Sequence, residues 1–580
     1  MIKMKYIVTF LIGFLYVLSA DSLDFITSNV VGPGVTHHHE YKNEGPWNIH
    51  ILEIDLSDSL IHLETVKAED SIIGNERTSN MSDRRNYEGH RVIGAINGDF
   101  YGVNGIPIGA QIIQGTVLKT PYSRSIFAMD VNKQPYIDIL DFIGHLFATN
   151  GTDIEITDVN TDRLSDNLII YNSFYGSTTQ TNHWGTEIIA HYIDNGMDVN
   201  TPRIFVVANK DSIMAEGHGN NTIPNNGLIL SGHGISAEYL NDHIFVGDTL
   251  MYNLEMLPIV EPLQEMIGGM PRLIRNSTAT VEWDEEGTSY SFAHDRHPRS
   301  AIGFNQDSSR VFFFTVDGRQ PGYSIGMSLF ELADYMLEWE VSQGLNLDGG
   351  GSTTMVVRGN VINSPSDNNG ERAVSNALMV ISRAPTSDIS ILRVSPEIVN
   401  LEPDTQEQFT INGFDQYFNP INIMGDSVIW TCTQEIGLID SSGIFTSGSL
   451  VGTGHVWATY QTIVGTSTVY VDDFMNADEI DREENLVTKE FSLKQNFPNP
   501  FNPSTTIHFS IHNDSNLSLK VFNVYGQEVA TLLDKHVIAG SYHIIWNGQD
   551  HSGKQLGSGM YFAQLESESF LAVNKMVLLK

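Results

Sequence analysis

The first two thirds of the chain carry short apolar runs that begin or end in polar residues. Runs of this length, bounded by turn residues, predict buried β-strands. Four runs carry side chains suited to a binding or catalytic site at one end: Asn97 with Asp99, Arg299, Asp317 with Arg319, and the stretch from Asp348 to Thr354. Polar strand ends often build sites on a rigid scaffold, so the pattern favours one site where the four groups meet.

One stretch between the last two groups has helical periodicity. Residues 327–339 place their apolar residues on one helical face, with Ser328 as a suitable N-cap, and these are Leu329, Leu332, Ala333 and Met336. This predicts the longest helix of the chain, leading into the strand before Asp348. Residues 120–275 alternate strands with polar loops. We therefore expect an α+β catalytic domain with mixed sheets and few helices.

The pattern changes after residue 384. Short alternating strands with regular turns run to residue 471, which is typical of a β-sandwich. Residues 473–492 are acidic and predict a linker, and a second all-β module follows at 493–580. Two small all-β sandwich domains are therefore expected after the catalytic domain.

Composition narrows the possible partners. The chain has 580 residues, 41% of them hydrophobic, and 70 acidic against 32 basic residues give a formal net charge of −38. Such a surface repels nucleic acids and anionic membranes. An anionic substrate would have to bind at a local cluster of arginines.

The N-terminus has the features of a signal peptide over residues 1–20. Lys3 and Lys5 precede an apolar run, and Ala20 offers a small residue for cleavage. No other run approaches about 18 uninterrupted apolar residues, so no transmembrane segment is expected in the mature chain. The single cysteine, Cys432, excludes an intramolecular disulfide.

The glycine-rich stretch suggests specific chemistry. Gly349, Gly350 and Gly351 allow close backbone approach, and successive N–H groups in such a turn can form an anion-binding nest. The stretch lacks the lysine of a P-loop and the spacing of a dinucleotide fold. It fits a carboxylate held beside a phosphate or sugar, while the alternative is a plain turn between strands. For Asp317 and Asp348, the alternative is likewise a turn or N-cap aspartate.

No metal site is expected. His37-His38-His39-Glu40 lies before the first clear strand pattern, and we interpret it as a solvated loop because adjacent histidines point to different faces. No other cluster of His and Asp residues with metal-ligand spacing stands out, which disfavours a metal phosphodiesterase.

The four motifs, together with Glu371-Arg372-Ala373-Val374-Ser375, resemble the phosphodiester glycosidase family over roughly residues 45–383. The resemblance implies hydrolysis of a sugar-1-phosphodiester, such as that of N-acetylglucosamine, with cleavage on the glycosidic side and release of free sugar and a phosphomonoester. Asp99 stands where many members carry glycine, and Ser300 where threonine is common.

The C-terminal part has resemblances of its own. Residues 386–472 are similar to bacterial Ig-like domains, and 493–580 resemble the C-terminal sorting domain of type IX secretion through Gln495-Asn496-Phe497-Pro498-Asn499-Pro500. This implies export by the type IX machinery to the surface or surroundings of a gram-negative bacterium.

We therefore predict a signal peptide at 1–20, a catalytic domain at 21–384, an Ig-like module at 386–472, a linker at 473–492 and a sorting domain at 493–580. Asp348 and Asp317 are the candidate catalytic residues, and no cofactor is expected. The candidate substrate-binding residues are Arg299, Arg319, Arg372, Asn97, Asp99, Gly349, Gly350, Gly351, Ser352 and Thr353. The alternative is a non-catalytic surface module that binds anionic glycans.

Overall fold

The computed structural model describes most of residues 25–578. The stretches outside the described residues are 44, 195, 212–217, 424–426, 451, 472–480, 483–491, 495, 497–498, 500, 502–503, 512–514, 524–526, 538–539, 551–553 and 568–569. The expected signal peptide and most of the expected linker therefore lie outside the described part of the chain.

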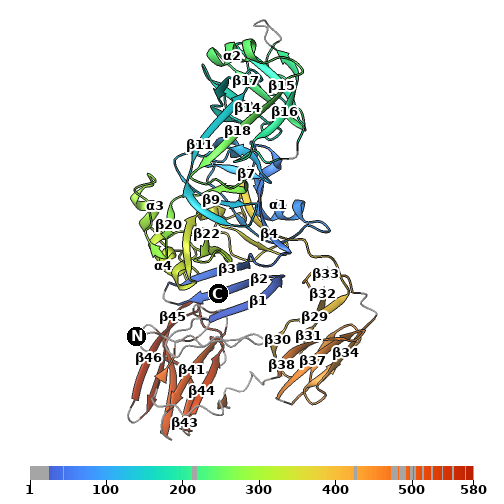
Figure 1. The fold of residues 1–580 in the computed structure, drawn as a ribbon. Helices are drawn as coiled ribbons and strands as arrows, with labels where there is room; N and C mark the ends of the chain where they lie inside the picture. The colour runs from blue at the N-terminus through green and yellow to red at the C-terminus, as the bar shows by residue number, and fades with distance from the viewer. Residues whose placement is uncertain are drawn as a thin grey trace. The chain divides into compact units, whose positions relative to one another are not determined.

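The chain divides into two compact units. The first runs to Asp388 and includes 415–419, and the second holds the remaining residues from Ile389 onward. Sheets dominate both (Figure 1), and the described residues contain four α-helices: α1 (Thr78–Arg85), α2 (Ile235–His243), α3 (Tyr290–His294) and α4 (Leu329–Glu338). Of the expected α+β fold with mixed sheets and few helices, the scarcity of helices is confirmed, and strands dominate the described residues.

An antiparallel eight-stranded sheet is the centre of the first unit. Its order is β1 (Phe25–Gly32), β2 (Val35–Lys42), β3 (Trp47–Asp55), β23 (Arg310–Val316), β22 (Arg299–Asn305), β24 (Val341–Asn346), β20 (Arg272–Arg275) and β21 (Thr278–Ala279). The apolar side of α4 packs on one face, through Leu329, Leu332 and Met336. This helix is the longest of the described residues, and Ser328 caps it by accepting from the Glu331 N–H, as predicted.

A five-stranded sheet covers the opposite face. Its order is β26 (Asn360–Val361), β25 (Met355–Val357), β6 (Arg91–Asn97), β28 (Asn376–Ser382) and β4 (Ile61–Lys67). Ile96, Leu345 and Leu378 lie in one core that joins the two sheets. On its outer face, Met81 of α1 packs against Val92 and Met379. The first unit is therefore layered as helix, sheet, sheet, helix around its centre.

Two larger sheets and a two-stranded sheet of β5 (Glu76–Arg77) and β27 (Ala373–Val374) extend this unit. One consists of β10 (Pro135–Ile139), β9 (Ser125–Asp130), β19 (Leu263–Gly268), β7 (Gln111–Ile113) and β8 (Thr116–Lys119). The other, which we call the inserted lobe, consists of β12 (Asp153–Glu155), β11 (Asp141–Phe147), β18 (Thr249–Leu257), β16 (Arg203–Asp211), β15 (Thr186–Tyr192), β17 (Gly227–Gly232), β14 (Leu168–Tyr171) and β13 (Asp158–Val159). One apolar core joins the two sheets, with Ile112 and Phe205 among its members.

The second unit is built from strands with two separate apolar cores, within residues 389–471 and 501–578. The strands around the first core are β29 (Ile389–Ser395), β30 (Ile398–Leu401), β31 (Gln406–Gln408), β32 (Thr410–Asp415), β33 (Pro420–Ile421), β34 (Val428–Cys432), β35 (Gly437–Ile439), β36 (Ile444–Ser447), β37 (Gly452–Tyr460) and β38 (Ile463–Val471). Those of the C-terminal part are β39 (Asp481–Arg482), β40 (Ser492–Leu493), β41 (Thr505–Ile511), β42 (Ser515–Asn523), β43 (Glu528–Val537), β44 (Gly540–Trp546), β45 (Gly559–Ser567) and β46 (Phe570–Leu578).

The interpretation of residues 37–40 as a solvated loop is wrong. These residues lie in β2, between β1 and β3. His39 stacks on His50 of β3 with ring centroids 4.4 Å apart, and His37 Nε2 lies 3.1 Å from His50 Nδ1. Burial, followed by the charges of neighbouring histidines, lowers the pKa of His37 to about 4.

Candidate active site

The antiparallel register brings the four polar strand ends together. The start of β22 lies beside the end of β23, because Arg299 pairs with Val316, and beside the end of β24 through Ala301 and Asn346. The other sheet joins at the same place, since the Asp348 N–H donates to the Gly98 carbonyl at 2.9 Å. Residues about 250 positions apart in sequence thus line one edge.

Asn97 ties this edge together. Its Nδ2 donates to the Asp348 carbonyl (2.6 Å), and its Oδ1 accepts from the Ser300 hydroxyl (2.6 Å) and the Thr354 N–H (3.0 Å). The side chain is fully buried. These bonds fix Asn97 beneath the glycine turn, and Asn97 in turn positions that turn.

Asp348 is the carboxylate at the centre of the edge. Its Oδ1 accepts from the Gly349 N–H at 3.0 Å. Burial raises its pKa to about 6, although the Ser352 hydroxyl, the Gly349 N–H and the charge of Arg372 oppose the shift. A carboxyl with this pKa is mainly ionised at neutral pH yet poorly solvated, which suits a base or a nucleophile.

Two arginine heads flank the glycine turn. Arg319 is exposed and has a left-handed backbone (φ 61°), and a β-carbon added at Gly350 would lie 3.1 Å from its Nη2. Arg372 is held by Asp367 through two hydrogen bonds of 2.8 and 2.9 Å, and its Nη1 lies 3.5 Å from the Ser352 hydroxyl. Both guanidinium groups thus lie beside the turn that follows Asp348.

Arg299, a predicted phosphate ligand, is mostly engaged by the protein itself. Arg299 is 2% exposed, and its guanidinium donates to the main-chain carbonyls of Met327 (2.9 Å), Phe292 (2.7 Å) and Asp295 (3.0 Å). Burial, and then repulsion from Arg319, lowers its pKa to about 10. Arg299 holds the segments after α3 and before α4 in place beneath the site.

Asp317 is also fully buried and bonded within the protein. Its Oδ1 accepts from Asn363 Nδ2 and its Oδ2 from the Tyr323 hydroxyl, both at 3.0 Å, while the Ser364 N–H donates to both oxygens. Burial raises its pKa to about 6, and these bonds oppose the shift. The geometry makes Asp317 an anchor for the loop at Asn363 and leaves Asp348 as the carboxylate closer to Arg372.

Asp99 is buried behind the edge. Its Oδ2 accepts from the Gly109 N–H at 2.6 Å, and its own N–H donates to Asn376 Oδ1 at 2.8 Å. Burial raises its pKa to about 7, with a smaller contribution from the negative charge of Asp348. Its Oδ1 has no hydrogen-bond partner among the described residues. A β-carbon on Gly109 or Gly268 would crowd this carboxyl, so these glycines make room for it.

The predicted nest of N–H donors is largely absent. The N–H of Gly349 bonds to Asp348 Oδ1, that of Gly350 to the Pro298 carbonyl, and those of Ser352 and Thr353 to Gly349 and Gly350. These bonds shape the turn as the short helix η3 (Gly350–Ser352). The turn therefore brings side chains together and does not offer these four N–H groups to a ligand.

Sequence reasoning missed Tyr101, which lies beside Asp348, and Asp367, which pairs with Arg372. Tyr101 lies at the edge, and burial followed by the charge of Asp348 raises its pKa, against the effects of Ser352 and Arg372. It follows the Asn97 motif closely, which was its only signal. Asp367 orients Arg372, and nothing in the polar loop around it predicted that role.

Comparison with known proteins adds an independent finding. Residues 198–381 match the phosphodiester glycosidase family, and residues 495–579 match the secretion system C-terminal sorting domain. The first match includes Asp317, Arg319, Asp348 and Arg372. The second indicates secretion or a cell-surface location. No helix of the described residues is long and apolar enough to cross a membrane.

Curated relatives match a limited region. The chain is 32% identical over 122 residues to the N-acetylglucosamine-1-phosphodiester alpha-N-acetylglucosaminidase of Homo sapiens and 30% identical over the same length to that of Mus musculus. Each match covers 20% of this chain and 23% of the relative. Among solved structures, a hypothetical protein from Synechocystis is similar, with 21% identity, a TM-score of 0.47, and coverage of 60% of this chain and 62% of that one.

Proposed function

We propose that this chain is an exported hydrolase of sugar-1-phosphodiesters, because residues 198–381 match the phosphodiester glycosidase family and residues 495–579 match the secretion-system sorting domain. The observation that carries the proposal is the grouping of one poorly solvated carboxylate, Asp348, with two arginine heads around a glycine turn. N-acetylglucosamine-1-phosphodiester, which appears in the names of the relatives, is the first substrate to test.

Arg319 and Arg372 would hold the phosphodiester. A guanidinium matches the geometry of phosphate oxygens with two parallel hydrogen bonds, and it keeps its charge at any relevant pH. The rest of the chain, with its net charge of −38, would repel the substrate. Asp367 fixes the orientation of Arg372, so one arginine is held in place and the exposed Arg319 closes on the anion.

Asp348 would act at the anomeric carbon. The bond from that carbon to the bridging oxygen breaks, the phosphate keeps the oxygen, and the oxygen of water ends on the sugar. Asp348 either attacks the carbon first or takes the proton from water. A phosphate leaves readily and the arginines stabilise its charge, so a second carboxylic acid is not essential. Asp317, Asn97 and Arg299 would position this arrangement.

Turnover in ¹⁸O-labelled water tests the proposal. Purified protein should release free sugar that carries the label, with unlabelled phosphomonoester, and a chelator should leave the rate unchanged. Asp348→Asn should abolish turnover while the protein still folds. Label in the phosphate would instead indicate a phosphodiesterase. Binding of the substrate without turnover by wild-type protein would support the alternative of a glycan-binding surface module.

The domain layout and export route complete the proposal. The signal peptide (1–20) directs the chain across the inner membrane, and the type IX machinery then recognises the sorting domain (493–580) in a gram-negative bacterium. The Ig-like module (386–472) and the acidic linker (473–492) separate the catalytic domain (21–384) from that signal.

A further inference from the structure

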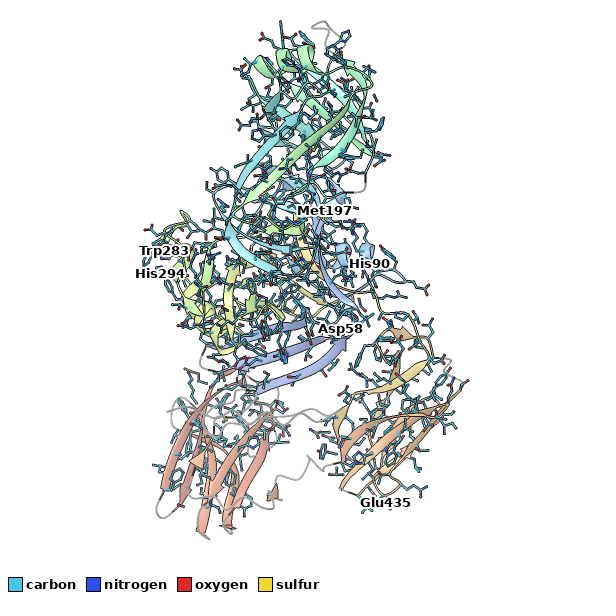
Figure 2. The ribbon with its side chains drawn as sticks, viewed as in Figure 1. Asp58, His90, Met197, Trp283, His294 and Glu435 are labelled. Atoms are coloured by element: carbon cyan, nitrogen blue, oxygen red, sulfur yellow. The ribbon has the colours of Figure 1, made fainter. Side chains whose placement is uncertain are left out.

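A second group of reactive side chains lies away from the candidate active site. His62 and Glu64 are two residues apart on β4, so both project from one face of the strand. His90 comes directly before β6, near α1 (Figure 2). Among the described residues, these three are the one set of at least three His, Cys, Asp or Glu side chains close enough to share a metal ion, with ligand atoms within 4.8 Å of one another.

The group is at the opposite end of its sheet from Asp348. Ser382 of β28 pairs with Ile61 and Arg91, whereas Asn376 at the other end pairs with Lys67. The strand β6 separates His90 from Asn97, and seven residues at about 3.3 Å each place them roughly 20 Å apart. A ligand at this group would therefore not touch the candidate active site.

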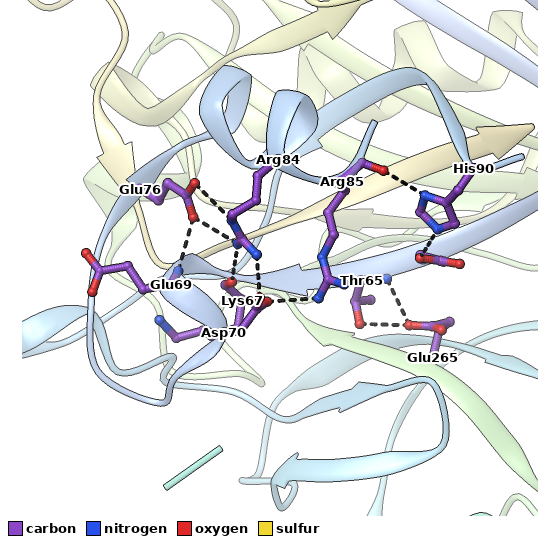
Figure 3. A network of polar contacts seen from close by, with 10 residues as sticks. Thr65, Lys67, Glu69, Asp70, Glu76, Arg84, Arg85, His90 and Glu265 are labelled. Carbon is purple, nitrogen blue, oxygen red and sulfur yellow. Dashed lines mark hydrogen bonds and ion pairs between the residues drawn. The ribbon is translucent and has the colours of Figure 1, made fainter. Parts of the chain in front are cut away.

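The contacts of His90 show which of its ring nitrogens faces Glu64. Its Nδ1 lies 2.7 Å from the Arg85 carbonyl, which can only accept, so Nδ1 carries a proton (Figure 3). Its Nε2 lies 2.9 Å from Glu64 Oε2. Because Nδ1 is engaged by the carbonyl, Nε2 is the nitrogen that faces the carboxylate and can bind a metal ion.

His62 provides the second nitrogen. Its Nε2 lies 2.7 Å from Glu64 Oε1, and the three side chains are at most 12% exposed. Arg383 also reaches Glu64, at 4.0 Å, but its side chain is 60% exposed and can move away. Around one zinc ion at bond lengths of about 2.0–2.1 Å, neighbouring ligand atoms lie roughly 3.4 Å apart, so small adjustments of these side chains would suffice.

We propose that His62, Glu64 and His90 form a binding site for a divalent transition-metal ion, with Zn²⁺ as the best fit. Two imidazole nitrogens and one carboxylate oxygen suit zinc and similar ions, whereas Ca²⁺ and Mg²⁺ prefer oxygen ligands throughout. The Arg85 carbonyl fixes the tautomer and the ring orientation of His90, which is the usual outer support of a metal-bound histidine. The ion would fasten the turn after α1 to β4, and the proposal does not depend on the catalytic one.

The sequence did not reveal this group. Glu64 and His90 are 26 residues apart, and β28 lies between their strands in the sheet. The expectation of no metal site was based on spacing along the chain, whereas the fold brings these three side chains together.

The test uses the untagged full chain after treatment with a chelator and dialysis. Calorimetric titration with Zn²⁺ should show one more site in wild-type protein than in His62→Gln. Any zinc that the variant still binds at this group should be held at least about tenfold more weakly. Zinc at about 100 times its dissociation constant should raise the melting temperature of wild-type protein by several degrees, but not that of His62→Gln. Co²⁺ should give the absorption bands of a tetrahedral nitrogen and oxygen site.

His145→Gln is the matched control. His145 pairs with Asp153 at 3.0 Å without a third ligand, so its loss should leave the zinc site intact. His62→Gln is preferred to His90→Gln because His90 also anchors Arg85. Equal zinc stoichiometry and affinity in wild-type protein and His62→Gln, or no zinc uptake by wild-type protein, would overturn the proposal. Turnover of the chelated protein reports separately on the catalytic proposal.

Discussion

At the scale of single residues, the ionised form of Asp348 opposes folding. Its pKa rises from 3.8 in the unfolded chain to about 6 because it is buried. The folded state therefore binds the proton of Asp348 more tightly than the unfolded chain does. The stability that this protonation contributes is fully present below pH 3.8 and is lost as the pH rises through about 6. The carboxylate that we propose as the reactive group therefore lowers the free energy of unfolding at neutral pH.

Asp348→Asn should stabilise the protein at neutral pH. The neutral amide removes the penalty of the buried charge, so we expect the free energy of unfolding to rise by about 1–3 kcal/mol at pH 7 and to change little at pH 4. Urea unfolding at the two pH values measures this. A variant less stable at pH 7 than wild-type protein would show that the carboxylate makes favourable contacts that outweigh its burial.

The same pKa should appear in the kinetics. If ionised Asp348 is the base or nucleophile, kcat/KM should rise with pH through about 6 and then level off. A pH–rate profile on a sugar-1-phosphodiester checks this. A profile that is flat from pH 4.5 to 7.5 would assign the reactive role to another group.

Arg319→Lys should weaken catalysis although it keeps the charge. Lysine cannot reproduce a paired guanidinium–phosphate contact, so we expect a loss of about 1.5–3 kcal/mol, or roughly 10–150-fold in kcat/KM. Arg310→Lys is the control, since Arg310 lies on β23 and pairs with Glu53. If the two variants have the same kinetics, Arg319 does not contact the substrate.

The residues that could be predicted from sequence are those at strand ends. Asp348 and Arg319 follow apolar runs directly, and the structure brings both to the same edge. Arg299 satisfies the same rule, yet its side chain turns inward to three carbonyls. The direction of a long side chain depends on partners such as Met327 that are distant in sequence, so no local pattern reveals it.

At the scale of elements, α4 connects two of the site's strands. It lies between β23 and β24 and begins with a capping box between Ser328 and Glu331. Ser328→Ala should cost about 0.5–2 kcal/mol of stability, because the N–H of Glu331 loses its acceptor. We expect kcat per folded molecule to stay the same, since the helix lies on the face of the sheet and not at its edge. Thermal unfolding and active-site titration measure the two effects, and a fall in kcat would place the helix closer to the chemistry.

Periodicity predicted some elements and missed others. The helix at 329–338 has a clear apolar face, and its cap was identifiable. Strand β2 lacks an alternation of apolar and polar residues. Its polar residues His37, His38 and His39 pack against β1 and β3 by stacking and hydrogen bonds. A strand whose partners are polar gives no hydrophobic signal for sequence analysis to detect.

At the scale of the whole molecule, the C-terminal module should be separable from the chemistry. The candidate site residues all lie in the first unit, and residues 501–578 have an apolar core of their own. Deletion of residues 493–580 should therefore leave full turnover in purified protein but keep the chain in the periplasm. Cell fractionation and a turnover assay measure the two results. If the truncated protein folds but is inactive, the assignment of catalysis to the first unit alone is wrong.

The inserted lobe enters and leaves its host at neighbouring points. β10 ends at Ile139 and β19 begins at Leu263, and between them Asp141 of β11 pairs with Leu257 of β18. Chain segments whose ends lie together can be exchanged without moving what they are attached to. The inserted lobe can therefore be exchanged as a unit. Another β module with an apolar underside could replace it while Asp348 and its arginines keep their places.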